Sequence, residues 1–303
     1  MITPQDAITA IKKRFGNHHG FRALHAKGLF CTGTFTATPE AATLTRAVPY
    51  QGQSIPVTVR FSNGGGDPTV ADYLPDVRGL AVSMHLPDGK RTDIVAQSAP
   101  RFPVRSADAF IEFVRAMEPG LGQLWKMPAF LLRHPESLGA LAASGPALAK
   151  PPASYTSLPY YAVHAFKWTA ANGSARWVRY RWLPETEIRL SPSAAKKLGP
   201  DYLQEELPKR LQSGPARFNL LVQIASADDN PDDPLIPWSS HEEVVAGTLE
   251  IRALDGSREK DGKPFVFDPV RVVDGIGLSN DPVLNYRTHA YTVSVEQRAG
   301  EKK

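Results

Sequence analysis

The 303-residue sequence predicts an α+β fold in which an antiparallel β-barrel is flanked by helices. Several short segments have the composition or the alternation of β-strands. Most of them are joined by short connections rich in turn residues, among them Pro87-Asp88-Gly89, and this favours antiparallel pairing in a closed or nearly closed barrel. Proline and glycine are plentiful, at 27 and 23 residues, which argues against a helical bundle.

Seven segments are expected to form strands. The clearest alternation runs from Val57 to Ser62 and places Val57, Val59 and Phe61 on one face. The other expected strands cover residues 31–38, 79–86, 92–97, 177–182, 218–224 and 244–251.

Helices are expected between and after these strands. Ser106 and Ser191 are good N-cap residues, and Pro192 suits a first helical turn. The cap residues at 279–282 predict a last helix that carries Arg287 and Tyr291. The expected helices lie at about 4–16, from 106 onwards, from 192 towards 211 and from 282 onwards, with short helices and loop over 119–159.

The composition argues against several classes of protein. An apolar content of 42% supports a sizeable core, and a net charge of +4 without a basic, aromatic-interleaved run argues against nucleic-acid binding. No apolar run approaches the ~20 residues of a membrane span, and no signal peptide is visible. Cys31 is the one cysteine, so no internal disulfide can form. The sequence therefore predicts a cytoplasmic protein without a membrane partner.

Two short segments carry residues that can hold a haem iron from both sides. In the last helix, Arg287 and Tyr291 are four residues apart and therefore lie on one face. A neighbouring cation favours ionisation of a phenol, and a phenolate is a hard anionic ligand suited to ferric iron, so Tyr291 is the predicted metal ligand. Near the N-terminus, Arg22-Ala-Leu-His25-Ala-Lys27-Gly28 supplies His25 to handle protons on the opposite face.

These segments belong to a series of motifs that resembles the haem catalases, in the group of catalase-related peroxidases. The further motifs are Val59-Arg60-Phe61-Ser62, Asp76-Val-Arg-Gly-Leu-Ala-Val82, Asp93-Ile-Val with Pro100, Asp233-Pro-Leu-Ile-Pro237, Phe267-Asp-Pro with Gly275-Ile, and Ser279-Asn-Asp-Pro. The resemblance implies a barrel of the catalase type, haem b as cofactor and one catalase-like domain over residues 1–303. The chain ends about a dozen residues after Tyr291, so we expect none of the wrapping segment or C-terminal helical region of the family's catalases, and hence a more open haem pocket.

The resemblance also implies roles for individual residues on the peroxide side. His25 resembles the distal catalytic histidine, and Ser62 resembles the hydroxyl that hydrogen-bonds this histidine and fixes its tautomer. Gln97 stands where catalases carry a distal asparagine, although an alignment shifted by one residue would place Ser98 there. The extra methylene of Gln97 is expected to displace the amide and to slow the oxidation of a second hydrogen peroxide.

Four further residues are implied to surround the haem. Arg22, Arg60 and Arg298 resemble the arginines that approach the propionates, to which arginine forms charge-assisted bonds. Phe110 resembles a distal aromatic, although an ordinary core position would look the same in sequence.

Two other features do not alter this interpretation. The glycine run Asn63-Gly-Gly-Gly66-Asp67 lacks the lysine of a phosphate loop and is expected to be a flexible turn. Lys150-Pro-Pro resembles a linker, but the predicted site draws on residues from both sides of it, so no domain boundary is expected there.

We therefore predict a haem-dependent peroxidase that reduces hydrogen peroxide or organic hydroperoxides with a small organic electron donor and has weak catalase activity. The resemblance also implies a homodimer. Two alternatives stay open on the sequence, namely a hydroperoxide-rearranging enzyme like the allene oxide synthases and a non-enzymatic haem-binding protein.

Overall fold

The computed structural model describes residues 2–118, 123–259 and 263–300. Within these residues, nine strands form one antiparallel sheet. They are β1 (Gly28–Ala37), β2 (Ser54–Asn63), β3 (Arg78–His85), β4 (Arg91–Gln97), β5 (Tyr160–Thr169), β6 (Ala175–Pro184), β7 (Ala216–Ile224), β8 (Glu243–Leu254) and β9 (Ile276–Leu278).

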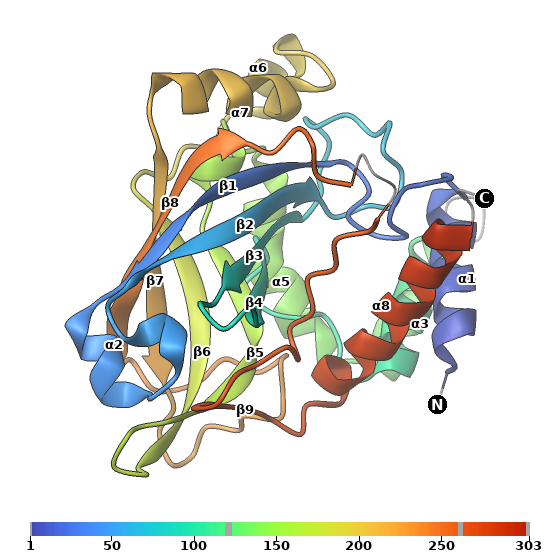
Figure 1. Ribbon diagram of the computed structural model, residues 1–303. Helices are drawn as coiled ribbons and strands as arrows, with labels where there is room; N and C mark the ends of the chain where they lie inside the picture. The colour runs from blue at the N-terminus through green and yellow to red at the C-terminus, as the bar shows by residue number, and fades with distance from the viewer. Residues whose placement is uncertain (1, 119–122, 260–262, 301–303) are drawn as a thin grey trace.

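The sheet closes into a barrel (Figure 1). Its strand order is β4-β3-β2-β1-β8-β7-β6-β5-β9, and Gln97 of β4 pairs with Tyr161 of β5 to join the two ends of the eight-stranded part. Strand β9 pairs with β5 as a short addition. The predicted antiparallel barrel with flanking helices is confirmed, and each of the seven expected strands is present.

Strand β2 shows how the barrel provides both a core and a second covered surface. Val57, Val59 and Phe61 share one face, as predicted, and lie in the main apolar core with no more than 3% of their surface exposed. Arg60 and Ser62 on the opposite face are also buried. A barrel strand that is buried on both faces has other parts of the chain packed on its outer side, and the candidate site lies there.

Eight α-helices lie in the described part of the chain. They are α1 (Pro4–Phe15), α2 (Pro39–Leu44), α3 (Ala107–Ala116), α4 (Gln123–Arg133), α5 (Ser137–Ala149), α6 (Pro192–Lys197), α7 (Tyr202–Ser213) and α8 (Pro282–Gly300). The Ser106 and Ser191 side chains accept hydrogen bonds from backbone amides of α3 and α6, as their predicted cap roles require.

The prediction of one continuous helix from residue 192 is wrong. The structure has two helices, α6 and α7, where the sequence predicted a single helix from 192 towards 211. Gly199 adopts the left-handed backbone region at φ 102° and is followed by Pro200. The left-handed backbone of Gly199 breaks the helix, and Pro200 disfavours the helical conformation at the residue before it, so the chain turns between the two segments.

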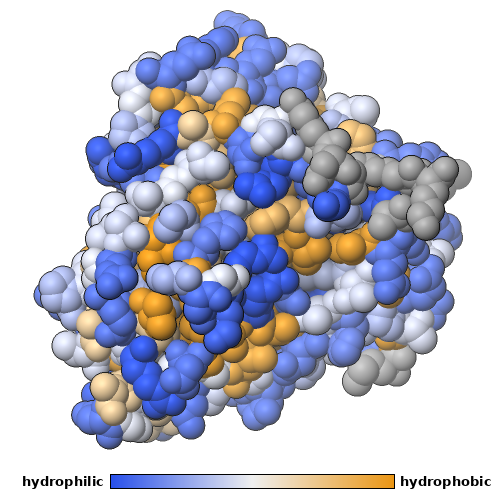
Figure 2. All heavy atoms as spheres, in the orientation of Figure 1, coloured by the Kyte–Doolittle hydropathy of each residue, from blue (hydrophilic) through white to orange (hydrophobic). Residues whose placement is uncertain are grey.

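Helix α8 packs beside α1 and α3 on one side of the barrel (Figure 1). Ile11 of α1 and Val114 of α3 join an apolar cluster that also contacts Tyr286 of α8. On the face shown in Figure 2, most side chains are hydrophilic, and apolar side chains gather between the barrel strands and α8. No helix in the described residues is long and apolar enough to cross a membrane.

Candidate active site

A cavity of about 670 Å³ separates the outer face of β2, β3 and β4 from helices α1, α3 and α8. This volume is within the range of small-molecule and cofactor sites, and most of the lining is apolar. The cavity brings together the nine side chains that the sequence proposed for the site, namely Arg22, His25, Arg60, Ser62, Gln97, Phe110, Arg287, Tyr291 and Arg298. In sequence, these residues extend from Arg22 near the N-terminus to Arg298 in α8.

His25 is held by the glycine run that follows β2. Its backbone lies in the left-handed region at φ 56°, which a histidine rarely adopts. The His25 amide donates to Gly64 O and the Ala26 amide donates to Gly65 O, each at 3.0 Å. The Gly64 and Gly65 amides in turn donate to the Asp76 carboxylate. The run predicted as a flexible turn is therefore a hydrogen-bonded support for the histidine.

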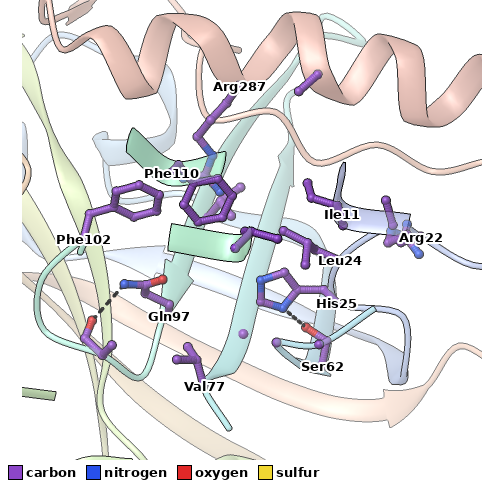
Figure 3. Close-up of a pocket in the computed structure, with 18 of the residues that line it drawn as sticks. Ile11, Arg22, Leu24, His25, Ser62, Val77, Gln97, Phe102, Phe110 and Arg287 are labelled. Atoms are coloured by element: carbon purple, nitrogen blue, oxygen red, sulfur yellow. Dashed lines mark hydrogen bonds between the residues drawn. The ribbon is translucent and has the colours of Figure 1, made fainter. Parts of the chain in front are cut away.

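The imidazole of His25 packs against a glycine that leaves room for it. Nδ1 lies 3.0 Å from Ser62 Oγ (Figure 3). Ser62 is paired with Gly79 across β2 and β3. A Cβ atom at position 79 would lie 2.6 Å from Ser62 Oγ and 2.8 Å from His25 Nδ1. The absence of a side chain at Gly79 thus permits the contact between Ser62 and His25.

The surroundings of His25 keep its ring neutral. Burial lowers its pKa to about 3, and the nearby cations Arg60, Arg287 and Arg22 act in the same direction. A neutral imidazole with one nitrogen oriented by Ser62 has its other nitrogen available to accept a proton. The site therefore contains an unprotonated imidazole in a mostly apolar cavity.

Arg287 and Tyr291 form the opposite wall on α8. Arg287 Nε donates to Tyr291 Oη at 2.8 Å, as their spacing of four residues predicted. Behind them, Arg287 Nη1 donates to His164 Nε2 at 3.0 Å, and His164 Nδ1 lies 2.6 Å from Asp281 Oδ2. Because Arg287 can only donate, His164 accepts at Nε2 and carries its proton on Nδ1. His164 therefore donates to the Asp281 carboxylate, so a hydrogen-bonded chain links Asp281 through His164 to the Arg287 guanidinium.

Sequence reasoning missed two members of this chain of contacts. His164 lies on β5, a strand that was not predicted because a register shift between Ala162 and Ala165 interrupts its pairing and hides its alternation. Asp281 was noted only as part of a helix cap, a role it also fulfils by accepting from the Val283 and Leu284 amides. No local pattern links Asp281 to Arg287, because the contact between them runs through His164.

Gln97 lines the cavity with its amide turned aside. Its Nε2 donates to Ala99 O and Arg101 O, at 3.3 and 3.2 Å, in the loop after β4. Figure 3 shows the Gln97 amide nitrogen in a hydrogen bond at the edge of the cavity. Phe110 lies nearby with its ring 5.4 Å from that of Phe102, in a stacked arrangement. The amide donors of Gln97 are thus engaged with the backbone, and two aromatic rings cover this part of the cavity.

The three arginines Arg22, Arg60 and Arg298, here called the arginine cluster, supply positive charge at one side of the cavity. Arg60 Nη2 donates to the carbonyls of His25 and Ala26. Arg60 Nε is buried and has no hydrogen-bond partner in the described residues. A buried guanidinium with an open donor fits an anionic ligand. With an arginine-paired phenol on the opposite wall and an apolar interior, the residues present fit a haem with its propionates at the cluster.

Fold and site together define a β-barrel protein with a cofactor-sized cavity outside the barrel. The chain belongs to the catalase family, since residues 17–303 match the family model described as Catalase. It is 46% identical to the catalase-related peroxidase of Mycolicibacterium paratuberculosis, over 99% of this chain and 96% of that protein. It is 33% identical to the catalase-related peroxidase of Synechococcus elongatus, over 98% of this chain and 89% of that protein.

Solved catalases share the fold. A bacterial catalase superposes with a TM-score of 0.80 at 25% identity, over 99% of this chain and 61% of that one. Catalase A from Saccharomyces cerevisiae superposes with a TM-score of 0.81 at 22% identity, over 97% of this chain and 64% of that one. The chain therefore spans about three fifths of the solved catalases that it matches.

Proposed function

We propose that this protein is a haem-dependent peroxidase that reduces hydrogen peroxide or organic hydroperoxides with a small organic electron donor. Membership of the catalase family and the two relatives named catalase-related peroxidase support an oxidoreductase that acts on peroxide. The observation that carries the proposal is the placement of neutral His25 and arginine-paired Tyr291 on different walls of one cavity.

Tyr291 is the proposed iron ligand and Arg287 its activating partner. Arg287 Nε donates a hydrogen bond to the Tyr291 oxygen that would bind the iron, and His164 with Asp281 fixes the direction of that guanidinium. Haem b, when bound, supplies the redox-active iron at which peroxide is reduced. The arginine cluster would hold the propionates through charge-assisted hydrogen bonds.

His25 is the proposed acid–base group. Because its imidazole is neutral, it can accept the proton of the peroxide oxygen that binds and return it to the oxygen that departs. Ser62 holds Nδ1 and so leaves Nε2 for this transfer. The proton returned by His25 would let the departing oxygen leave as water or an alcohol rather than as an anion.

Weak catalase activity is expected from the geometry of Gln97. Oxidation of a second peroxide requires a donor that orients it, and the amide of Gln97 is bound to loop carbonyls instead. An organic donor does not need that orientation. We therefore expect electron donation from small organic molecules to exceed oxygen release.

We extend the proposal to one domain over residues 1–303, a cytoplasmic location and a homodimer. The single-domain proposal is supported by the barrel, which closes between β4 and β5 across the proline-rich stretch at Lys150. Sedimentation of the haem-loaded protein tests the homodimer.

Stopped-flow kinetics of the haem-loaded protein tests the function. We expect peroxide to oxidise a phenolic dye faster than oxygen is released, and we expect His25→Ala to abolish both while retaining haem. Dominant oxygen release would contradict the peroxidase proposal. Conversion of a fatty-acid hydroperoxide without dye oxidation would indicate the rearranging enzyme, and equal behaviour of His25→Ala and wild type would indicate a haem carrier.

A further inference from the structure

Glu259 lies against the arginine cluster at the edge of the cavity. Its carboxylate accepts from Nη1 and Nη2 of Arg22, at 3.2 and 2.8 Å, and lies 3.5 Å from Nη1 of Arg298. The Phe265 amide donates to the same carboxylate at 2.7 Å. A side chain of the protein thus holds Arg22 in the forked geometry that arginine uses with any carboxylate, including a haem propionate.

Arg22 has no forked face left for a second carboxylate. A guanidinium presents two such faces, one formed by Nη1 with Nη2 and the other by Nε with Nη2. Nη2 gives one proton to Glu259 and the other to Phe265 O, at 2.7 Å. Both faces therefore share an atom that is already engaged. A propionate can form a bidentate pair with Arg22, here called the Arg22 fork, only if Glu259 gives up its hydrogen bonds to Nη1 and Nη2.

Arg60 differs from Arg22 in this respect. Its Nε is buried without a hydrogen-bond partner in the described residues, so this arginine can receive an anion without displacing one. Burial and the charge of Arg22 both lower the pKa of Arg60, and the charge of Glu259 opposes them. Glu259 therefore offsets part of the repulsion within the arginine cluster while no other anion is bound.

We propose that Glu259 occupies the Arg22 fork in the haem-free protein and yields it to a propionate, so that haem binding is an exchange of one carboxylate for another. This inference depends on the proposed haem function. Two further observations support it. The Glu259 side chain is 20% exposed and can swing towards solvent, and its backbone lies at φ 63°, a left-handed region that a glutamate rarely adopts.

The exchange has a thermodynamic signature. A contact present only in the haem-free protein stabilises that form alone and must weaken haem binding by the same free energy. Glu259→Gln keeps the size of the side chain and removes its charge. We expect the variant to lower the unfolding temperature of the haem-free protein, to leave that of the haem-loaded protein unchanged, and to bind haemin about tenfold more tightly.

The measurements are the melting temperatures of both forms and the rate of haemin transfer to apomyoglobin. Glu250→Gln is a matched control, because Glu250 also contacts two arginines, Arg217 and Arg252, and is 23% exposed, but it lies on β8 outside the cavity lining. This control is expected to leave haemin affinity unchanged.

An unchanged or weaker haemin affinity in Glu259→Gln would overturn the proposal, as would equal destabilisation of both forms. If the haem-free variant does not fold, the haemin release rate of the loaded variant decides alone, with slower release supporting the exchange. Failure of the wild-type protein to bind haemin would instead refute the proposed function, so the two failures are distinguishable.

Discussion

Gly79→Ala offers a sharp test of how His25 is positioned. The new Cβ would lie 2.8 Å from His25 Nδ1 and 2.6 Å from Ser62 Oγ, both shorter than real Cβ contacts. To regain ordinary contact at 3.4 Å, the imidazole must retreat by about 0.6 Å, which breaks its alignment with Ser62. Displacements of this order in a catalytic group reduce rates by about 10²-fold, and overpacking costs about 1–3 kcal/mol of stability.

The assay is the rate of peroxide-dependent dye oxidation by haem-loaded protein, together with the haem content and the free energy of unfolding. We expect Gly79→Ala to lose about 10²-fold in rate while retaining haem and a folded barrel. Gly277→Ala in β9 is the matched control, since its Cβ would meet Lys167 Cβ at 3.4 Å, an ordinary contact. Turnover of Gly79→Ala within threefold of wild type, with haem bound, would refute this account of the position of His25.

Three further predictions follow from the same contacts. His25→Ala should lower the rate of O–O cleavage by about 10²–10⁴-fold with haem retained, measured by stopped flow, and a small effect would exclude an acid–base role. Because folding lowers the pKa of His25 from 6.5 to about 3, the unfolded chain binds more protons between those pH values, so stability should fall as pH falls through that window, by at most about 1.4 kcal/mol per pH unit. Urea unfolding of haem-free protein at pH 4 to 7 should show a steeper slope in wild type than in His25→Ala, and equal slopes would contradict the shift. Asp281→Asn keeps a capping side chain but removes the charge behind His164, so it should speed haem release about tenfold, and an unchanged release rate would show that this contact does not support Tyr291.

The barrel was predictable because its strands carry local signals. Alternation in β2 and turn residues between β3 and β4 identified antiparallel strands without knowledge of their partners. The break between α6 and α7 also had a local signal, Gly199 followed by Pro200, which the expected single helix ignored. Strand β5 had a weaker signal because of its register shift and its burial on both faces.

The contacts of the candidate site also divide into those with a local sequence signal and those without one. The contact between Arg287 and Tyr291 is fixed by helical spacing and was predictable, as was the shared face of Arg60 and Ser62 on β2. Contacts that depend on the tertiary fold were not. His164 meets Arg287 across 123 positions of sequence, and Glu259 meets Arg22 across 237. No local pattern specifies a pairing at that separation.

The central claim is that Tyr291, paired with Arg287, holds a haem iron on the wall opposite His25. The most direct test is the absorption spectrum of haem-loaded wild type and Tyr291→Phe, recorded before and after one equivalent of hydrogen peroxide. The account predicts a high-spin ferric spectrum of the phenolate-ligated type in wild type, prompt bleaching on adding peroxide, and loss of both in Tyr291→Phe. Identical spectra for the two proteins, or no haem uptake by wild type, would contradict it.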